Sequence, residues 1–112
     1  MPYLLTQDAE PVRPVIERLV DRYDPEEIWL FGSRAEGRAH PESDWDLLVV
    51  LPDDVPPARL DLVEAWRAVK DLRMPVDVVP CTRTEFDIER DEFDTLPRAA
   101  FLRGRRLYAR SA

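Results

Sequence analysis

Residues 27–51 read EIWLFGSRAEGRAHPESDWDLLVVL, and this stretch decides what kind of fold the chain can form. It opens and closes with short apolar runs, and a polar segment separates them. Short apolar runs bounded by turn residues are typical of buried β-strands. We therefore expect strands over 27–31 and 45–51, joined by a segment that begins with Gly32-Ser33.

The rest of the chain carries helical and strand signals in alternation. Apolar residues recur at helical spacing, prolines fall near predicted first turns, and Gly104 follows the last predicted helix as a stop. The expected elements are, in chain order, a helix over 8–23, a Pro-rich loop over 52–57, a helix over 58–72, a strand over 76–79, a short helix opened by a capping box at Thr82 and Glu85, a helix over 96–103 and an edge strand over 105–108.

The length and the element order bound the fold class. A chain of 112 residues is long enough for one compact domain and too short for two, so we expect a single domain over 1–112. The element order predicts an α+β fold of α/β-like character, with a small mixed β-sheet and helices packed mainly on one face. The side chains expected to pack inside are Leu62, Ala65 and Val69 and the three tryptophans, Trp29, Trp45 and Trp66.

Composition excludes some partners. The net charge of −7 argues against binding to long nucleic acid, because contacts with phosphate dominate that affinity. No apolar stretch approaches the ~20 residues that span a bilayer, and no signal pattern begins the chain. The single Cys81 has no internal disulfide partner. We expect a cytoplasmic protein without a membrane partner, and a homo-oligomer is compatible with the sequence.

Two carboxylates project from the start of the second strand. Side chains alternate along a strand, so Asp44 and Asp46 share a face while Trp45 points into the core. Their repulsion is unfavourable unless a cation neutralises it, and hard divalent cations prefer oxygen ligands. Asp77 joins them if the third strand pairs beside the second; alternatively it is paired with an arginine. Three carboxylates on one face suit phosphoryl transfer with two metal ions.

Gly32-Ser33 offers the other half of such a site. A strand that ends in this pair and continues into a helical turn presents backbone N–H groups and a hydroxyl to an anion. Glycine also lets the backbone approach phosphate closely. Arg34 and Arg38 lie near enough in sequence to neutralise a triphosphate, whereas His40 is expected to be an exposed loop residue. Each motif alone has an ordinary structural interpretation, but their order on successive strands favours a site.

Residues 32–47, GSRAEGRAHPESDWDL, resemble the signature of the DNA polymerase beta-like nucleotidyltransferase superfamily. More narrowly, they resemble the minimal nucleotidyltransferases. The resemblance runs from the first helix to Leu107-Tyr108, and Asp77 matches the family's third carboxylate. It implies a metal-dependent enzyme that moves a nucleoside monophosphate, AMP from ATP, onto a hydroxyl acceptor.

The resemblance also implies residue roles. Asp44 and Asp46 would hold two Mg²⁺ ions, and Asp77 would bind the ion on the acceptor side and help to activate the attacking hydroxyl. The residues that would bind the nucleotide are Gly32, Ser33 and Arg34.

A partner follows from the same resemblance. Minimal nucleotidyltransferases are often paired with a helical HEPN-domain protein, and some act as antitoxins that modify a tyrosine of that toxin with AMP. Apolar positions near the C-terminus are candidates for this contact, with core packing as the alternative: Phe93, Leu96, Phe101 and Leu102. Two other functions stay open, a non-catalytic antitoxin that acts by binding and a nucleotidyltransferase that acts on a small molecule.

Overall fold

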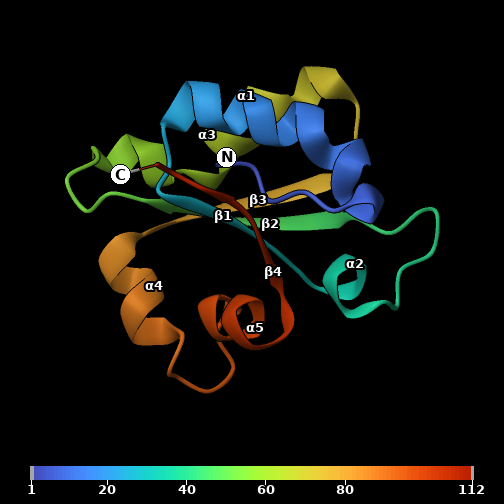
Figure 1. The fold of residues 1–112 in the computed structure, drawn as a ribbon. Helices are drawn as coiled ribbons and strands as arrows, with labels where there is room; N and C mark the ends of the chain where they lie inside the picture. Colours follow the sequence, from blue (N-terminus) through green and yellow to red (C-terminus); the bar gives the residue numbers. More distant parts are fainter. Residues whose placement is uncertain (1, 112) are drawn as a thin grey trace.

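A four-stranded mixed sheet lies at the centre of the molecule (Figure 1). The computed structural model describes residues 2–111 and places the strands in the order β3-β2-β1-β4. β1 (Glu27–Phe31) pairs antiparallel with both β2 (Trp45–Leu51) and β4 (Arg105–Ala109). β2 pairs in parallel with β3 (Val76–Thr82). The prediction of a small mixed sheet is confirmed.

The strand β3 is longer than the sequence suggested. It was expected to end before Pro80, but it continues to Thr82 with Pro80 opposite Val49. Proline is tolerated here because β3 is an edge strand, whose outer side needs no N–H donor. The bounds of β1 and β2 are those predicted, and β4 is one residue longer than expected.

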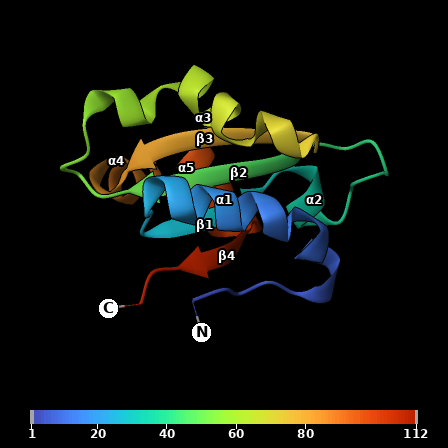
Figure 2. The same cartoon turned by 90° about the horizontal axis from the view of Figure 1, so that it is seen from above.

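Two helices, α1 (Arg13–Tyr23) and α3 (Leu62–Val69), cover one face of the sheet, as Figure 2 shows from above. A 3₁₀ segment, η1 (Gln7–Val12), precedes α1, so the first predicted helix is α-helical only from Arg13 onward. The larger core lies between these helices and the sheet. Its fully buried members include Val15, Ile16, Leu19, Ile28, Leu30, Leu47 and Leu51.

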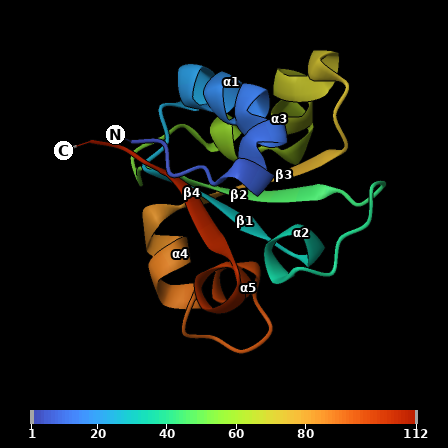
Figure 3. The same cartoon turned by 45° about the vertical axis from the view of Figure 1, so that its right-hand side comes forward.

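The opposite face is covered as well, by α4 (Arg83–Glu89) and α5 (Leu96–Arg103) (Figure 3). A smaller cluster of buried side chains fills this side: Leu48, Val50, Cys81, Phe86 and Ala100. The expectation of helices mainly on one face therefore holds for the larger core only. The physical reason is that β2 is apolar on both faces after Asp46. Both faces must therefore be shielded from water.

The two C-terminal helices begin and end for identifiable reasons. α4 opens with the predicted capping box, in which Glu85 N–H donates to Thr82 Oγ1 at 3.1 Å and Thr82 N–H donates to Glu85 Oε1 at 2.9 Å. α5 ends before Gly104, whose backbone is extended. A Cβ on Gly104 would lie 2.3 Å from the Leu30 carbonyl oxygen, so glycine is required there for close approach to β1.

The helix expected over 58–72 is α-helical only over Leu62–Val69, and a different side of it faces the core. Ala65 and Val69 face the core, but Leu62 and Trp66 are 58% and 56% exposed, so their predicted packing was wrong. Small side chains let α3 approach the sheet closely, and the larger apolar residues remain outside. The flanking 3₁₀ turns are η2 (Pro57–Leu60) and η3 (Lys70–Leu72). No helix within residues 2–111 has the length and apolar character needed to cross a membrane.

Candidate active site

Two carboxylates from neighbouring strands meet at one end of the sheet. Trp45 is 5% exposed and belongs to the larger core, so Asp46, the next residue of β2, points to the opposite face. Asp77 of β3 lies directly beside Asp46 in the parallel register. Its alternate neighbours Val79 and Cys81 pack in the smaller cluster, which places Asp77 on the same face as Asp46.

The third acid, Asp44, acts on Asp46 through its charge. Burial, and then the nearby negative charges of Asp77 and Asp44, raise the pKa of the Asp46 carboxyl above its usual value. Asp44 and Asp77 are exposed at the rim of the site. Within residues 2–111, none of the three acids forms an ion pair with an arginine or lysine. The described chain therefore leaves this cluster of negative charge uncompensated.

Gly32 is packed directly against the Asp46 carboxylate. A Cβ on Gly32 would lie 2.2 Å from Asp46 Oδ2, and the backbone has a φ of +76°, which other residues rarely adopt. The single-turn helix α2 (Ser33–Glu36) starts at the next residue, and its Ala35 and Glu36 N–H groups both donate to the Gly32 carbonyl at 3.1 Å. The Gly-Ser turn therefore lies directly against Asp46, although the two are separate in sequence.

Arg34 is held on the other side of β2. Its guanidinium donates to the carbonyl oxygens of Ser43 and Pro41 and lies over the ring of Trp45 at 4.5 Å from the centroid. Because Trp45 points away from Asp46, these contacts direct Arg34 away from the acids. The structure brings Gly32, the residue before Ser33, to the Asp46 carboxylate but does not bring the Arg34 guanidinium there.

Other basic groups gather near α2. Arg38 lies 3.4 Å from the Glu36 carboxylate, and Arg103, from the end of α5, lies 3.8 Å from the same carboxylate. Arg103 was not singled out from the sequence, because only the fold brings α5 back to α2. No local sequence signal could have identified it.

The acids fit divalent cations by chemistry and by position. Mg²⁺ prefers carboxylate oxygens, and the cradle beside Asp46 exists only because Gly32 has no Cβ. Across residues 2–111, however, no group of three His, Cys, Asp or Glu side chains is already arranged around a point where an ion would sit. Asp44 and Asp77 are exposed and free of ion pairs to Arg or Lys, so they are able to turn toward an ion. The carboxylates of Asp44, Asp46 and Asp77 are suitable ligands for Mg²⁺, but residues 2–111 do not hold them in a coordinating arrangement before the ion binds.

Two surface hollows lie elsewhere on the molecule. One, of about 520 Å³, is lined by Tyr23, Arg59 and Glu64 at the opposite end of the sheet. The second, of about 330 Å³, follows α5 and is lined by Phe93 and Arg103 among others. Neither is lined by the three acids.

Comparison with known proteins identifies the family. A family model described as a nucleotidyltransferase domain matches residues 12–106, which is most of the chain. The chain belongs to the nucleotidyltransferase domain family. The resemblance inferred from the sequence is thereby confirmed, and this nucleotidyltransferase is an enzyme of that class. No curated protein matches its sequence.

Solved structures share the fold of this nucleotidyltransferase. A crystal structure of a toxin–antitoxin with AMP-PNP aligns with a TM-score of 0.62 at 22% identity, covering 95% of this chain and 76% of the other. The toxin–antitoxin MntA–HepT aligns with a TM-score of 0.54 at 21% identity, covering 88% and 69%. A variant of that complex with two aspartates replaced by glutamate has a TM-score of 0.59 at 22% identity, covering 88% and 73%. At these identities the likeness establishes the fold alone.

Proposed function

We propose that this nucleotidyltransferase is an antitoxin that moves AMP from ATP onto a tyrosine hydroxyl of a HEPN-domain toxin in a Mg²⁺-dependent reaction. The observation that carries the proposal is the cluster of acids that forms no ion pair with an arginine or lysine of residues 2–111, with Asp46 packed against Gly32. An uncompensated cluster of this kind is what external cations and the phosphates bound to them require.

Each residue has a defined task in this proposal. Asp44 and Asp46 would hold two Mg²⁺ ions, and Asp77 would bind the ion on the acceptor side. Bound Mg²⁺ neutralises the charge that develops on the phosphoryl group during transfer. Asp77 accepts the proton of the attacking hydroxyl, whose oxygen bonds to the α-phosphorus as the bond to pyrophosphate breaks. Gly32 and Ser33 bind the departing phosphates through backbone N–H groups and a hydroxyl.

The structural relatives support both the nucleotide and the kind of partner. One of them is a toxin–antitoxin with AMP-PNP, an analogue of ATP. In the MntA–HepT variant, the two replaced aspartates are two positions apart, the spacing of Asp44 and Asp46. We take this spacing as support for the same pair of acids in this chain.

A protein acceptor is favoured by the exposed apolar side chains on the α4/α5 side of the sheet. Helix α5 covers the side of the sheet that carries Asp46 (Figure 3). Apolar side chains on α5 and shortly before it are exposed. Phe93 is 93% exposed, and Leu96, Phe101 and Leu102 are between 44% and 53% exposed. Phe93 and Leu96 line one surface hollow together, and contiguous exposed apolar side chains are typical of protein interfaces. We propose that the toxin covers them while its tyrosine reaches the acids.

The first experiment measures transfer of label from α-labelled ATP to a HEPN-domain protein encoded beside this chain, with and without Mg²⁺. Asp44→Asn and Asp46→Asn should each lower the rate by about 10³-fold, because a ligand that neutralises transition-state charge is lost. Transfer that continues at the wild-type rate in both variants would overturn the assignment of these acids.

A second measurement separates catalysis from simple binding. Cells that express the toxin should be rescued by the wild-type chain and not by Asp46→Asn, although the variant is folded and still binds the toxin. If the variant rescues growth fully, the chain neutralises by covering its partner, and the proposed enzymatic mechanism is wrong. Labelled small molecules without the toxin would reveal the remaining alternative, a small-molecule acceptor.

A further inference from the structure

We infer that Arg34 is a positioning residue for Asp44 and does not contact the nucleotide. It clamps the turn that leads into β2 and so fixes the place of the first acid. This inference rests on the proposed function, in which Asp44 is a metal ligand.

The clamp consists of three hydrogen bonds to backbone carbonyls. Arg34 Nε and Nη2 donate to the Ser43 carbonyl oxygen at 3.2 and 2.9 Å, and Nη2 donates also to the Pro41 carbonyl at 3.3 Å. Ser43 immediately precedes Asp44. The guanidinium therefore fixes the peptide unit from which the backbone of Asp44 continues.

Asp44 is fixed from its other side as well. Trp45 is 5% exposed, and its backbone N–H donates to the Pro75 carbonyl at 2.8 Å. The Arg34 guanidinium lies over the Trp45 ring, 4.5 Å from the ring centroid. A guanidinium within about 6 Å of an aromatic centroid is held by a cation–π interaction. The same side chain thus touches both neighbours of Asp44, and it does so on the face opposite Asp46.

The clamped segment is a turn closed by its own hydrogen bonds. Ser43 N–H donates to the His40 carbonyl at 2.9 Å, and the His40 N–H donates to Ser43 Oγ at 3.0 Å. Holding the Ser43 carbonyl therefore holds the whole turn. Only arginine offers several donors in a rigid planar fork, so lysine is an incomplete substitute for Arg34.

The test compares three variants with the wild-type chain. Arg34→Met keeps the apolar stem and removes the donors, and Arg34→Lys keeps the charge. The matched control is Arg59→Met. Arg59 lies over the Tyr23 ring at 5.6 Å and donates to the Arg22 carbonyl at 2.6 Å, so it makes the same kinds of contact at the other end of the sheet.

The first readout needs no metal or nucleotide. Amide hydrogen exchange over residues 37–44 should become faster in Arg34→Met, because a clamp that closes the turn has been removed, and should be unchanged there in Arg59→Met. Exchange that is as slow in Arg34→Met as in the wild type would overturn the inference.

The second readout separates positioning from nucleotide contact. Loss of a residue that orients a metal ligand costs roughly 10–100-fold in metal affinity or activity. At saturating Mg²⁺, Arg34→Met should therefore lower kcat by roughly 10–100-fold, with the KM for ATP changed by less than about threefold, and Arg34→Lys should recover part of kcat. The Mg²⁺ concentration needed for half-maximal rate should rise in the same variant.

Two results would contradict the inference, and a third would contradict the proposed function instead. A raised KM for ATP with an unchanged kcat would make Arg34 a nucleotide contact, and equal losses in Arg34→Met and Arg59→Met would make its role general stability. If the wild-type chain itself transfers nothing to its partner, the proposed function fails, and the positioning role falls with it.

Discussion

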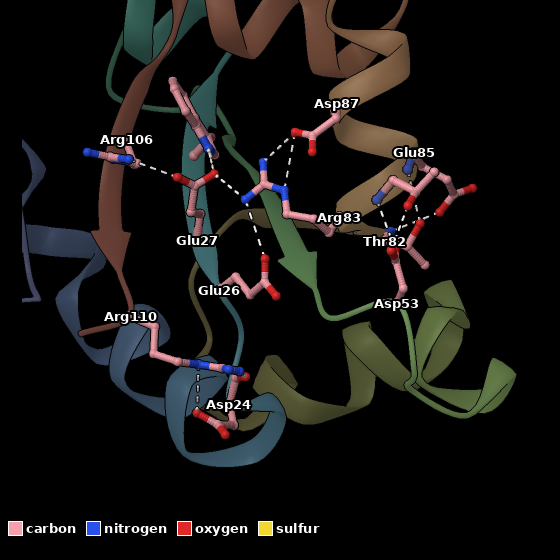
Figure 4. Close-up of polar contacts among 12 residues, drawn as sticks. Asp24, Glu26, Glu27, Asp53, Thr82, Arg83, Glu85, Asp87, Arg106 and Arg110 are labelled. Carbon is pink, nitrogen blue, oxygen red and sulfur yellow. Dashed lines mark hydrogen bonds and ion pairs between the residues drawn. The ribbon is translucent and has the colours of Figure 1, made fainter. Parts of the chain in front are cut away.

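The two ends of the α4/α5 face of the sheet carry acids in opposite electrostatic settings. At one end, Asp46 lies near the negative charges of Asp77 and Asp44, and none of the three acids forms an ion pair with an arginine or lysine among residues 2–111. At the other end, Glu27 of β1 is surrounded by donors, as Figure 4 shows. Its carboxylate accepts from Arg106 at 2.8 Å and from Arg83 and the Trp29 indole N–H, each at 3.1 Å. The side chain of Glu27 is only 15% exposed.

These settings shift the two pKa values in opposite directions. Burial and nearby carboxylates raise the pKa of Asp46. Burial also works against ionisation of Glu27, but hydrogen bonds from Arg106 and Trp29 and the charge of Arg83 outweigh it and lower the pKa of Glu27. A carboxylate near arginines of the chain, such as Glu27, thus stabilises the fold through ion pairs. Carboxylates that have no such arginine, such as Asp46, form a candidate cation-binding site.

The largest expected effect contrasts an acid-to-amide change at each end. Asp77→Asn should lower transfer by about 10³-fold, because it removes a proposed metal ligand and proton acceptor. Glu27→Gln should keep kcat within about threefold, since it lies at the far end of the sheet and touches no reacting group. Rates with labelled ATP check both. An equal loss of transfer rate in the two variants would show that the two ends of the sheet do not differ in function.

The second prediction concerns stability at the arginine-rich end. Glu27→Gln should lower the free energy of unfolding by about 1–3 kcal/mol, because Arg83 and Arg106 lose their charged acceptor in a mostly buried place. Urea unfolding at neutral pH measures the difference. Its pH dependence has a definite sign, because the Glu27 pKa is lowered from 4.5 on folding.

Ionised Glu27 stabilises the fold fully above about pH 4.5, and this contribution is lost as the pH falls through the lower pKa of the folded state. The difference in unfolding free energy between the wild type and Glu27→Gln should therefore be constant from pH 7 to about 5 and shrink below about 4.5. A difference that grows on acidification would mean that the Glu27 pKa is raised in the folded state.

The smallest expected effect is a gain in stability at the acidic end. The Asp46 pKa is raised on folding, so its ionisation costs stability at neutral pH, and this cost is relieved as the pH falls. Without metal, Asp46→Asn should raise the free energy of unfolding by about 1 kcal/mol, whereas Asp54→Asn, in an exposed turn, should change it by less than about 0.5 kcal/mol. Thermal unfolding in a metal chelator measures both.

Added Mg²⁺ should separate the wild type from Asp46→Asn in thermal unfolding. An ion that binds only the folded state raises stability, so the wild-type melting temperature should rise with Mg²⁺ while that of Asp46→Asn stays nearly constant. A destabilised Asp46→Asn in the absence of metal would show that Asp46 is a structural residue like Glu27.

Much of this fold was accessible from local pattern. The bounds of β1, β2 and α5 and the capping box of α4 follow from short-range rules that the structure obeys. The errors lie where tertiary contacts decide. Leu62 and Trp66 are exposed because α3 packs through small residues, and periodicity alone does not say which stripe of a short helix faces inward.

The site divides in the same way. Alternation along β2 was sufficient to predict that Trp45 is buried and that Asp46 points to the other face. The role of Arg34 was not accessible, because its proximity to Gly32-Ser33 suggested phosphate while the folded turn offered it the Ser43 carbonyl.

The sequence by itself determined where the strands begin, the spacing of the acids and the family, because side-chain alternation and turn chemistry act over a few residues. Only the tertiary structure decided which charges are compensated. Glu27 meets Arg83 across 56 positions of the chain and Arg106 across 79, and Asp77 reaches Asp46 only through the pairing of β3 with β2. Electrostatic compensation depends on distance in space, and distance in space is set by packing.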